Sequence, residues 1–236
     1  MVRLKRLSAP KFWKIPKKEK KWIVTPRPGP HKKFESIPLV IIVRDLLKLA
    51  DSSKEVNRII KIKEVLVDGK PRVDKKYPVG LFDVINIPKI DKYYRVVPSR
   101  TGLKLIEIPK KEANLKLSRI KNKTMTKGGI LQLNLHDGKN ILVDKKEEKK
   151  VYNTGDSLLI ELPSQKIVEH IKMEKETTAI LTAGQNMGDI AKIKEIIMTR
   201  SREPNKVLCT KDQREFEAII DYVFAVGKTK PVIKIE

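Results

Sequence analysis

The stretch IPLVIIVRDLLKLADSSKEVNRIIKIKEVLVDGKPRVD, residues 37–74, decides the fold of the first half of the chain. Its first part, PLVIIVRDLLKLA, predicts a helix that has Pro38 near its first turn. The residues from Ser52 to Glu55 have capping-box spacing, in which the serine accepts from a backbone amide and the glutamate reaches back. We therefore predict a second helix that begins at Asp51 or Ser52.

This second helix has two different faces. Val56, Ile59 and Ile60 repeat at helical spacing on one side, which predicts a packed face. The opposite side carries polar and cationic residues at helical spacing, namely Lys54, Asn57, Arg58 and Lys61. One side is therefore expected to pack and the other to face outward.

A hairpin follows the second helix. The short apolar run from Val65 to Val67 leads into Asp68-Gly69, a dipeptide typical of hairpin turns, and FDVINI after Gly80 predicts a further strand. Lys70 and Arg72 lie just beyond the turn. Two helices, a hairpin and outward cations make a module suited to binding phosphates. Solvated surface charge is the alternative reading of each cation, and it stays open.

The segment before this module is strongly basic. Lys, Arg, Pro and aromatic residues dominate it, and Glu19 is its only acid before Glu35. Such a segment repels itself, and its prolines lack backbone donors, so an extended arm that orders on binding is expected. Trp13 and Trp22 therefore need another surface, and one reading is that they pack outward against a partner molecule. The alternative is that Phe12 and Trp13 dock onto the protein's own modules, burying their large apolar area.

The rest of the chain predicts β structure. Residues 103–172 hold a second hairpin signal at Asp137-Gly138 and the strand candidates DSLLIELP and KIVEHIKM, which indicates a small antiparallel barrel or sheet. In the last quarter, TTAILTAGQNMGDIAKIKEI has Gly184 and Gly188 at a turn, where glycines allow a ligand backbone to approach or serve only the turn itself. Strands around 206–210 and 222–226 would complete a small barrel.

Charge and composition point to a polyanionic partner. Lys and Arg number 52 against 29 Asp and Glu, for a formal net charge of +23, which favours nucleic acid ahead of an anionic membrane surface. No apolar run approaches the roughly 20 residues that span a bilayer, and the N-terminus lacks a signal-peptide core, so a cytoplasmic protein is expected.

No catalytic or metal-binding pattern stands out. The sequence lacks a P-loop, G-x-G-x-x-G, H-E-x-x-H and G-x-S-x-G. Cys209 is the only cysteine and is expected to be a buried small apolar residue, and the three histidines show no ligand spacing. Asp45 and Asp83 are the carboxylates nearest the cationic module, where pairing with Arg or Lys, or capping, is their expected role. Neither a cofactor nor a metal is predicted, nor a small-molecule substrate.

Several stretches together resemble one family. LKRLSAPKFWKI followed by Trp22 and PRPGPH, then IPLVIIVRDLLKLA and VLVDGKPRVDKKYPVGLFDVI, are similar to the archaeal and eukaryotic small-subunit ribosomal proteins of the S4e family. The resemblance covers nearly the whole chain. Where the family has a histidine before Leu-Lys-Arg, this chain has Arg3, which keeps a cation but no histidine-specific contact. The chain ends at Glu236 without a long extension, a short form that favours an archaeal source.

The resemblance implies an α+β fold of several modules. These are a basic extended arm at 1–37, a two-helix-plus-hairpin RNA-binding domain at 38–102, a central antiparallel β domain at 103–172 and an SH3-like β-barrel with a KOW motif at 173–236. It also implies a structural, non-enzymatic protein of the ribosome in the cytoplasm. Its partners would be small-subunit rRNA and neighbouring ribosomal proteins.

The residues predicted to contact RNA are mostly cations of the arm and the helical module. They are Arg3, Lys5, Arg6, Lys11, Trp13, Lys14, Lys17, Lys18, Lys20, Lys21, Trp22, Arg27, His31, Lys32, Lys33, Arg44, Lys54, Arg58, Lys61, Lys70, Arg72, Gly184 and Gly188.

Two rival functions stay open at the level of sequence. An RNA-modifying enzyme is one, because the same kind of RNA-binding module accompanies pseudouridine synthases; turnover in an assay for modified RNA would support it. A transcription elongation factor is the other, because KOW motifs occur there too; co-purification with RNA polymerase would support it.

Overall fold

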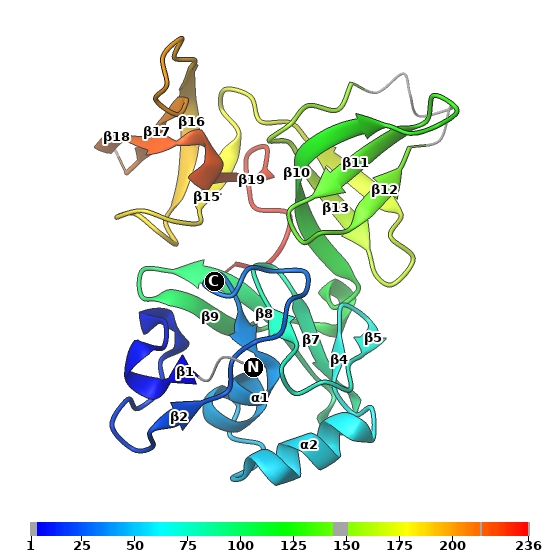
Figure 1. Ribbon diagram of the computed structural model, residues 1–236. Helices are drawn as coiled ribbons and strands as arrows, with labels where there is room; N and C mark the ends of the chain where they lie inside the picture. The colour runs from blue at the N-terminus through cyan, green and yellow to red at the C-terminus, as the bar shows by residue number, and fades with distance from the viewer. Residues whose placement is uncertain (1–3, 144–150, 213, 236) are drawn as a thin grey trace. The chain divides into compact units, whose positions relative to one another are not determined.

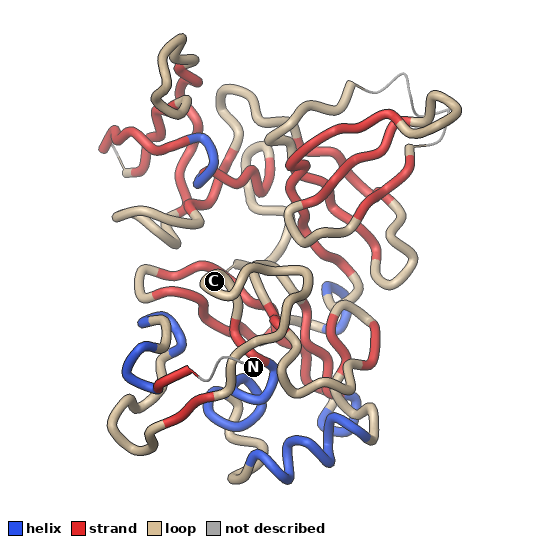
Figure 2. Tube along the Cα trace, in the orientation of Figure 1, coloured by secondary structure: helices blue, strands red, loops and turns tan. Residues whose placement is uncertain are grey.

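The computed structural model describes residues 4–143, 151–212 and 214–235 (Figure 1). The chain forms two compact units. The first contains Met1–Val97 and Thr101–Asn114, and the second contains Pro98–Arg100 and Leu115–Glu236. Helices are short and strands predominate in both units (Figure 2). Among the predicted RNA-binding residues, Arg3 lies outside the described residues.

Both predicted helices are present in the first unit. The first is α1 (Leu39–Ile41), which continues as a π-helical turn, η3 (Ile42–Leu46), directly after Pro38. The second is α2 (Ser53–Lys61), with Ser52 as its N-cap. The Ser52 hydroxyl accepts from the backbone N–H of Glu55 at 3.2 Å, and the Glu55 carboxylate accepts from the Ser52 N–H at 3.3 Å. This is the capping box that the sequence predicts.

An antiparallel sheet lies beside these helices. Its strands, in spatial order, are β5 (Lys70–Pro71), β4 (Leu66–Val67), β7 (Val84–Ile87), β8 (Lys92–Ser99) and β9 (Gly102–Glu107). Asp68 and Gly69 form the β4–β5 turn with φ of +53° and +71°, which confirms the predicted hairpin. Two short pairs complete the unit: β1 (Leu4–Lys5) with β2 (Trp22–Ile23), and β3 (Ile37–Pro38) with β6 (Pro78–Val79).

Isolated turns of 3-10 helix connect several of these elements. They are η1 (Arg6–Ser8), η2 (Lys11–Trp13), η4 (Pro88–Ile90) and η5 (Lys110–Glu112) in the first unit, and η6 (Ile220–Tyr222) in the second.

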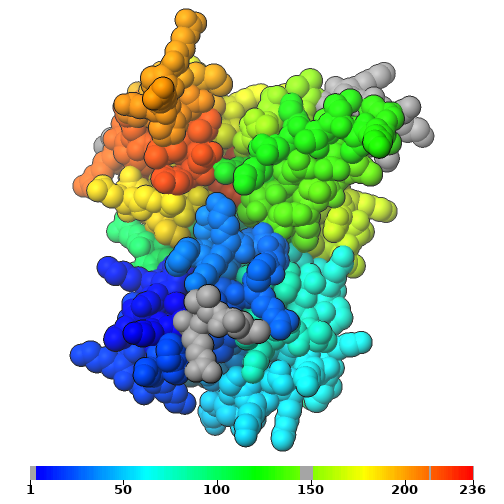
Figure 3. All heavy atoms as spheres, in the orientation of Figure 1, coloured from blue at the N-terminus to red at the C-terminus, as the bar shows by residue number. Residues whose placement is uncertain are grey.

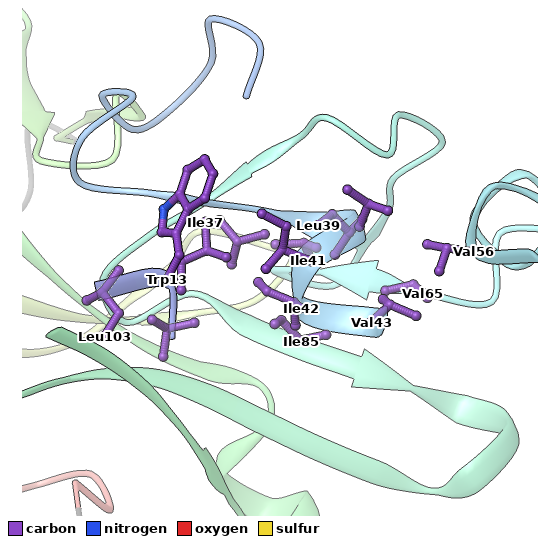
Figure 4. Packing of buried hydrophobic residues seen from close by; sticks show 14 of the residues in the cluster. Trp13, Ile37, Leu39, Ile41, Ile42, Val43, Val56, Val65, Ile85 and Leu103 are labelled. Carbon is purple, nitrogen blue, oxygen red and sulfur yellow. The ribbon is translucent and has the colours of Figure 1, made fainter. Parts of the chain in front are cut away.

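The core of the first unit includes the basic N-terminal segment. Trp13 is completely buried in a cluster with Ile37, Leu39 and Ile42, beside Leu103 of β9 (Figure 4). The ring of Phe12 is half-buried and meets the Trp13 ring edge-on, with centroids 6.5 Å apart. The expectation that Trp13 packs outward is therefore wrong, and the alternative, that Phe12 and Trp13 dock onto the protein itself, is confirmed.

The N-terminal segment is accordingly folded rather than extended. It contains β1, η1, η2 and β2, and its apolar residues Leu4, Ala9 and Ile15 are buried in the same cluster as Trp13. The apolar area of these side chains outweighs the repulsion between the lysines, because each lysine can keep its ammonium group in solvent while its neighbours pack.

The second unit consists of two five-stranded antiparallel sheets. The first runs in the order β12 (Asn140–Leu142), β11 (Leu131–Leu135), β10 (Leu115–Met125), β13 (Ser157–Glu161) and β14 (Ile167–Ile171). The second runs in the order β18 (Arg214–Ile219), β17 (Lys206–Lys211), β16 (Ile190–Ile197), β15 (Thr178–Leu181) and β19 (Val223–Gly227). The predicted strands of this half are confirmed. Among the described residues, no strand pairing closes either sheet into a barrel.

Each of these sheets covers its own apolar cluster. Leu133, Leu135 and Leu158 belong to the first cluster, and Ala179, Ile193 and Val207 to the second. Cys209 is buried in the second cluster, which confirms its predicted role as a small apolar residue.

Candidate RNA-binding surface

The outer face of α2 carries cations at fixed positions. Val56 and Ile60 are buried on one side of the helix, while Lys54, Arg58 and Lys61 are exposed on the other. The buried pair fixes the rotation of the helix, so the three cations must point away from the core. Figure 3 shows the cyan segment that contains α2 at the surface of the molecule.

The capping box strengthens this arrangement. Hydrogen bonds from Ser52 and the backbone lower the pKa of Glu55, so its carboxylate is ionised at the positive end of the helix. The Glu55 carboxylate accepts hydrogen bonds from the backbone of the cap and is attracted to Arg58. In the part of the chain that the structure describes, no carboxylate lies within ion-pair distance of Lys54 or Lys61.

The β4–β5 hairpin adds two cations of different character. Lys70 is exposed on β5. Arg72 is half-buried, and its guanidinium carbon lies 4.4 Å from the centroid of the Tyr77 ring, so the guanidinium stacks on that ring. Lys70 is therefore the freer of the two for a phosphate.

The predicted RNA-binding residues fall into three classes by exposure. The exposed ones are Lys5, Lys11, Lys14, Lys18, Lys20, Lys21, Trp22, Arg27, Lys32, Lys54, Arg58, Lys61, Lys70 and Gly184. The half-buried ones are Lys17, Lys33, Arg44, Arg72 and Gly188. The buried ones are Arg6, Trp13 and His31.

The three buried residues bond to the protein itself. Arg6 donates to the backbone oxygen of Pro16 and to the Glu19 carboxylate. The Trp13 indole donates to the backbone oxygen of Ser36 at 2.9 Å. His31 Nε2 lies 3.0 Å from an oxygen of Asp83. Because these side chains are almost completely buried and bonded within the protein, the prediction that they contact RNA is wrong, and their role is structural.

Several other cations that were predicted to contact RNA form ion pairs with carboxylates of the protein. Arg44 makes two hydrogen bonds to Asp45, at 3.0 and 2.7 Å, and these raise the pKa of Arg44. Arg27 lies 2.9 Å from Asp74. The expected pairing of Asp45 with its neighbouring arginine is thus confirmed. Asp83 pairs instead with His31, and also accepts from the backbone N–H of Gly80.

Gly184 and Gly188 form a tight turn between β15 and β16. Both have φ of +88°, a conformation that disfavours any residue with a Cβ. The Gly188 N–H donates to the Leu181 oxygen at 2.7 Å, and the Met187 N–H donates to the Gly184 oxygen at 3.4 Å. The turn itself therefore accounts for both glycines.

Neither a metal site nor an activated nucleophile stands out in the described part of the chain. No group of three or more His, Cys, Asp or Glu there could hold a metal ion. Burial raises the pKa of the Cys209 thiol to about 11, so it is protonated at neutral pH. Within the same residues, no helix has the length and apolar character needed to cross a bilayer.

The sequence interpretation missed some residues on these surfaces. Lys63 lies two residues beyond the end of α2 and is exposed, in a left-handed conformation with φ of +64°. Its position two residues beyond a cationic helix was the signal in the sequence that could have identified it. The sequence also contains no sign that Asn122 on β10, Asn134 on β11 and Asn140 on β12 lie opposite one another, because only the strand register shows it.

Comparison with known proteins identifies the family. Residues 90–167 match the model of ribosomal family S4e, and residues 3–34 match that of the RS4NT (NUC023) domain. The chain is 48% identical over 236 residues to small ribosomal subunit protein eS4 of Archaeoglobus fulgidus, covering 98% of this chain and 97% of the relative. The chain belongs to the ribosomal S4e family.

Further relatives agree with this assignment. Small ribosomal subunit protein eS4 of Methanocaldococcus jannaschii is 47% identical, covering 98% of this S4e chain and 96% of the relative. The crystal structure of 30S ribosomal protein S4e from Thermoplasma acidophilum has a TM-score of 0.69 and 34% identity, covering 83% of this chain and 96% of that one. The resemblance drawn from the sequence is confirmed. S4e is a family of ribosomal proteins and not of enzymes.

Proposed function

We propose that this S4e chain is a structural component of the small ribosomal subunit and binds rRNA mainly through backbone phosphates. The cationic face of α2 carries the proposal. Its apolar face is buried, so Lys54, Arg58 and Lys61 are held outward on a rigid element. Cations held this way bind phosphates and release counterions, whatever the base sequence.

The N-terminal segment supplies a second set of contacts in this proposal. Its exposed lysines are Lys5, Lys11, Lys14, Lys18, Lys20 and Lys21. Trp22 is 43% exposed, and the Lys21 ammonium lies 5.4 Å from its ring centroid. An aromatic face beside a cation suits stacking on a base or sugar. Because Trp13 anchors the segment from within, these groups would meet RNA from a folded surface.

The four-part organisation predicted from sequence is also proposed. The boundaries would be 1–37, 38–102, 103–172 and 173–236, with the first part folded onto the second. The sheet β15 to β19 is proposed to be the SH3-like KOW module. Its five antiparallel strands and the glycine turn between β15 and β16 support this.

Small-subunit rRNA and neighbouring ribosomal proteins are the proposed partners, and the cytoplasmic ribosome the proposed location. A KOW-containing transcription factor remains the competing function. Both would bind RNA, but they would travel with different assemblies.

The test is sedimentation of a cell lysate through a gradient at low and high salt, following this chain and RNA polymerase. Migration with the small subunit at both salts supports the proposal. Migration with polymerase would favour the transcription factor. A chain that stays at the top of both gradients would contradict both readings.

A further inference from the structure

Asparagines line up across three neighbouring strands of the second unit. Asn122 on β10 lies opposite Asn134 on β11, which lies opposite Asn140 on β12. Directly opposed side chains on one sheet face have Cβ atoms about 5 Å apart, so the three carboxamides form one row. The next row on the same face is Thr124, Gln132 and Leu142.

This row of asparagines runs against the amino-acid preferences of β-strands. Asparagine is depleted in strands, where β-branched and aromatic residues pack better. Three asparagines in register therefore weaken the sheet that they cover. Departures from local preference of this kind concentrate at functional sites.

The face that carries the row is open. Asn122 and Asn140 are exposed, and Asn134 is half-buried. The opposite face of the same strands holds Leu133 and Ile120, which are buried in the core and fix the register. Figure 3 shows the green segment that contains β10 and β11 uncovered toward the viewer.

The amides are partly organised already. Gln132 Nε2 donates to Asn134 Oδ1 at 2.7 Å, which orients the central carboxamide and leaves its N–H groups pointing away from that bond. Each carboxamide has two donors and an acceptor with two lone pairs. A row of them can pair with flat groups that offer both donors and acceptors.

Charge around the row favours an anionic partner over a protein. Residues 120–143 contain one carboxylate, Asp137, and four lysines. Lys121 and Lys127 are exposed, whereas Lys123 donates to the backbone oxygen of Tyr152 at 2.6 Å and Lys139 lies 3.4 Å from Asp137. That carboxylate is buried and paired with Lys116 at 2.9 Å. At the turn between β10 and β11, a Cβ on Gly128 or Gly129 would meet no atom within 4 Å, so the backbone of this turn is not covered by packed side chains.

We propose that this face binds unpaired nucleobases of rRNA. The carboxamides would hydrogen-bond base edges, as Asn and Gln do with adenine, while the exposed Lys121 and Lys127 would contact the adjoining phosphates. This inference rests on the proposed function. It adds recognition of base edges by asparagines to the phosphate contacts that are proposed for the cations.

The test uses the full chain, an in vitro transcript of small-subunit rRNA and an unrelated transcript of equal length. The variant N122T/N140T removes the two exposed carboxamides, and threonine suits strands and cannot form the bidentate pair. The expected result is about tenfold weaker binding to rRNA, the equivalent of one lost base contact. The slope of log affinity against log salt stays unchanged, because no cation is removed.

Chemical probing of the base edges gives a second readout. Wild-type protein is expected to protect a few bases, and N122T/N140T to lose that protection while phosphate protections remain. The matched control is N114T, which makes the same substitution at an exposed asparagine outside the row. A thermal unfolding profile like that of wild type confirms that each variant folds. The variant N122Q/N140Q, which keeps the carboxamides, should recover part of the affinity.

The outcomes separate the two proposals. Wild-type affinity and base protection in N122T/N140T would overturn the base-readout inference and leave the proposed function standing. Normal RNA binding with poorer incorporation into subunits would assign the face to a neighbouring protein, and would also overturn it. If wild-type chain shows no preference for rRNA over the unrelated transcript, the proposed function fails and the inference fails with it.

Discussion

The indole nitrogen of Trp13 donates a hydrogen bond to the carbonyl oxygen of Ser36 across 2.9 Å, and both residues are completely buried. This bond ties the basic N-terminal segment to the residue that precedes β3. The indole N–H needs a partner once its ring is buried, and the backbone supplies one. The lysines around Trp13 are therefore presented from a fixed surface.

Replacing Trp13 with alanine is expected to destabilise the isolated protein by about 3–5 kcal/mol, since a large buried aromatic side chain leaves a cavity. Trp22→Ala is the matched control. Trp22 is 43% exposed, so its loss is expected to cost about 0.5 kcal/mol or less. Urea unfolding of both variants measures the difference. An unchanged unfolding curve for Trp13→Ala would show that the segment does not dock.

Gly102 is predicted to be intolerant of alanine. It has φ of +117°, and a Cβ there would lie 2.0 Å from Cβ of Phe12 and 2.8 Å from its Cα. Gly102→Ala combines backbone strain with a clash against backbone, each costing about 1–3 kcal/mol. Gly128→Ala is the control, because Gly128 has φ of +97° and open space around it. Equal melting temperatures for the two variants would contradict the docking of Phe12 on β9.

The sequence predicted α2 and the β4–β5 hairpin because their signals are local. The capping box of Ser52 and Glu55 spans one helical turn, and Asp68-Gly69 is its own turn signal. The burial of Trp13 depends on contacts with Ser36 and β9. These positions are distant in the sequence, and composition does not show that they lie together. The charge of the N-terminal segment predicted an extended arm. That argument leaves out the apolar area that its side chains bury when the segment packs on the rest of the unit.

The candidate surface divides in the same way. The outward face of α2 follows from helical periodicity, so its cations were predicted correctly as exposed. The burial of Arg6 and His31 depends on Glu19 and Asp83, and charge alone gives no sign of those pairings. The asparagine row requires the register of three strands, which a single sequence does not specify.

Lys116 and Asp137 form a buried ion pair 2.9 Å apart, with the two side chains 1% and 0% exposed. Burial on its own would raise the pKa of Asp137, but attraction to Lys116, His136 and Lys139 outweighs it and holds the pKa well below its usual range. Lys116→Met leaves the carboxylate buried without its main partner, and is expected to cost about 3–5 kcal/mol at pH 7.

This cost should depend on pH with a definite sign. A carboxylate whose folded pKa is depressed stabilises the protein fully above its unfolded pKa of about 3.9, and the stabilisation declines as the pH falls below that value. The gap between wild type and Lys116→Met should therefore narrow on going from pH 7 to pH 3. Urea unfolding at both pH values measures it. A gap that is constant or widens toward acid would contradict the assigned role of the pair.

The triple variant K54A/K61A/K70A tests the cationic module. If each lysine binds one phosphate, their removal should lower the salt slope of rRNA binding by about 2 to 3, at roughly 0.7–0.9 per phosphate contact. The control K175A/K194A/K206A removes the same charge from lysines that pair with Glu195, Glu215 and Glu217. Its slope should stay close to that of wild type, because a lysine that neutralises a carboxylate displaces few counterions from RNA. Equal slopes in the two variants would mean that net charge alone governs binding, and that α2 holds no specific phosphates.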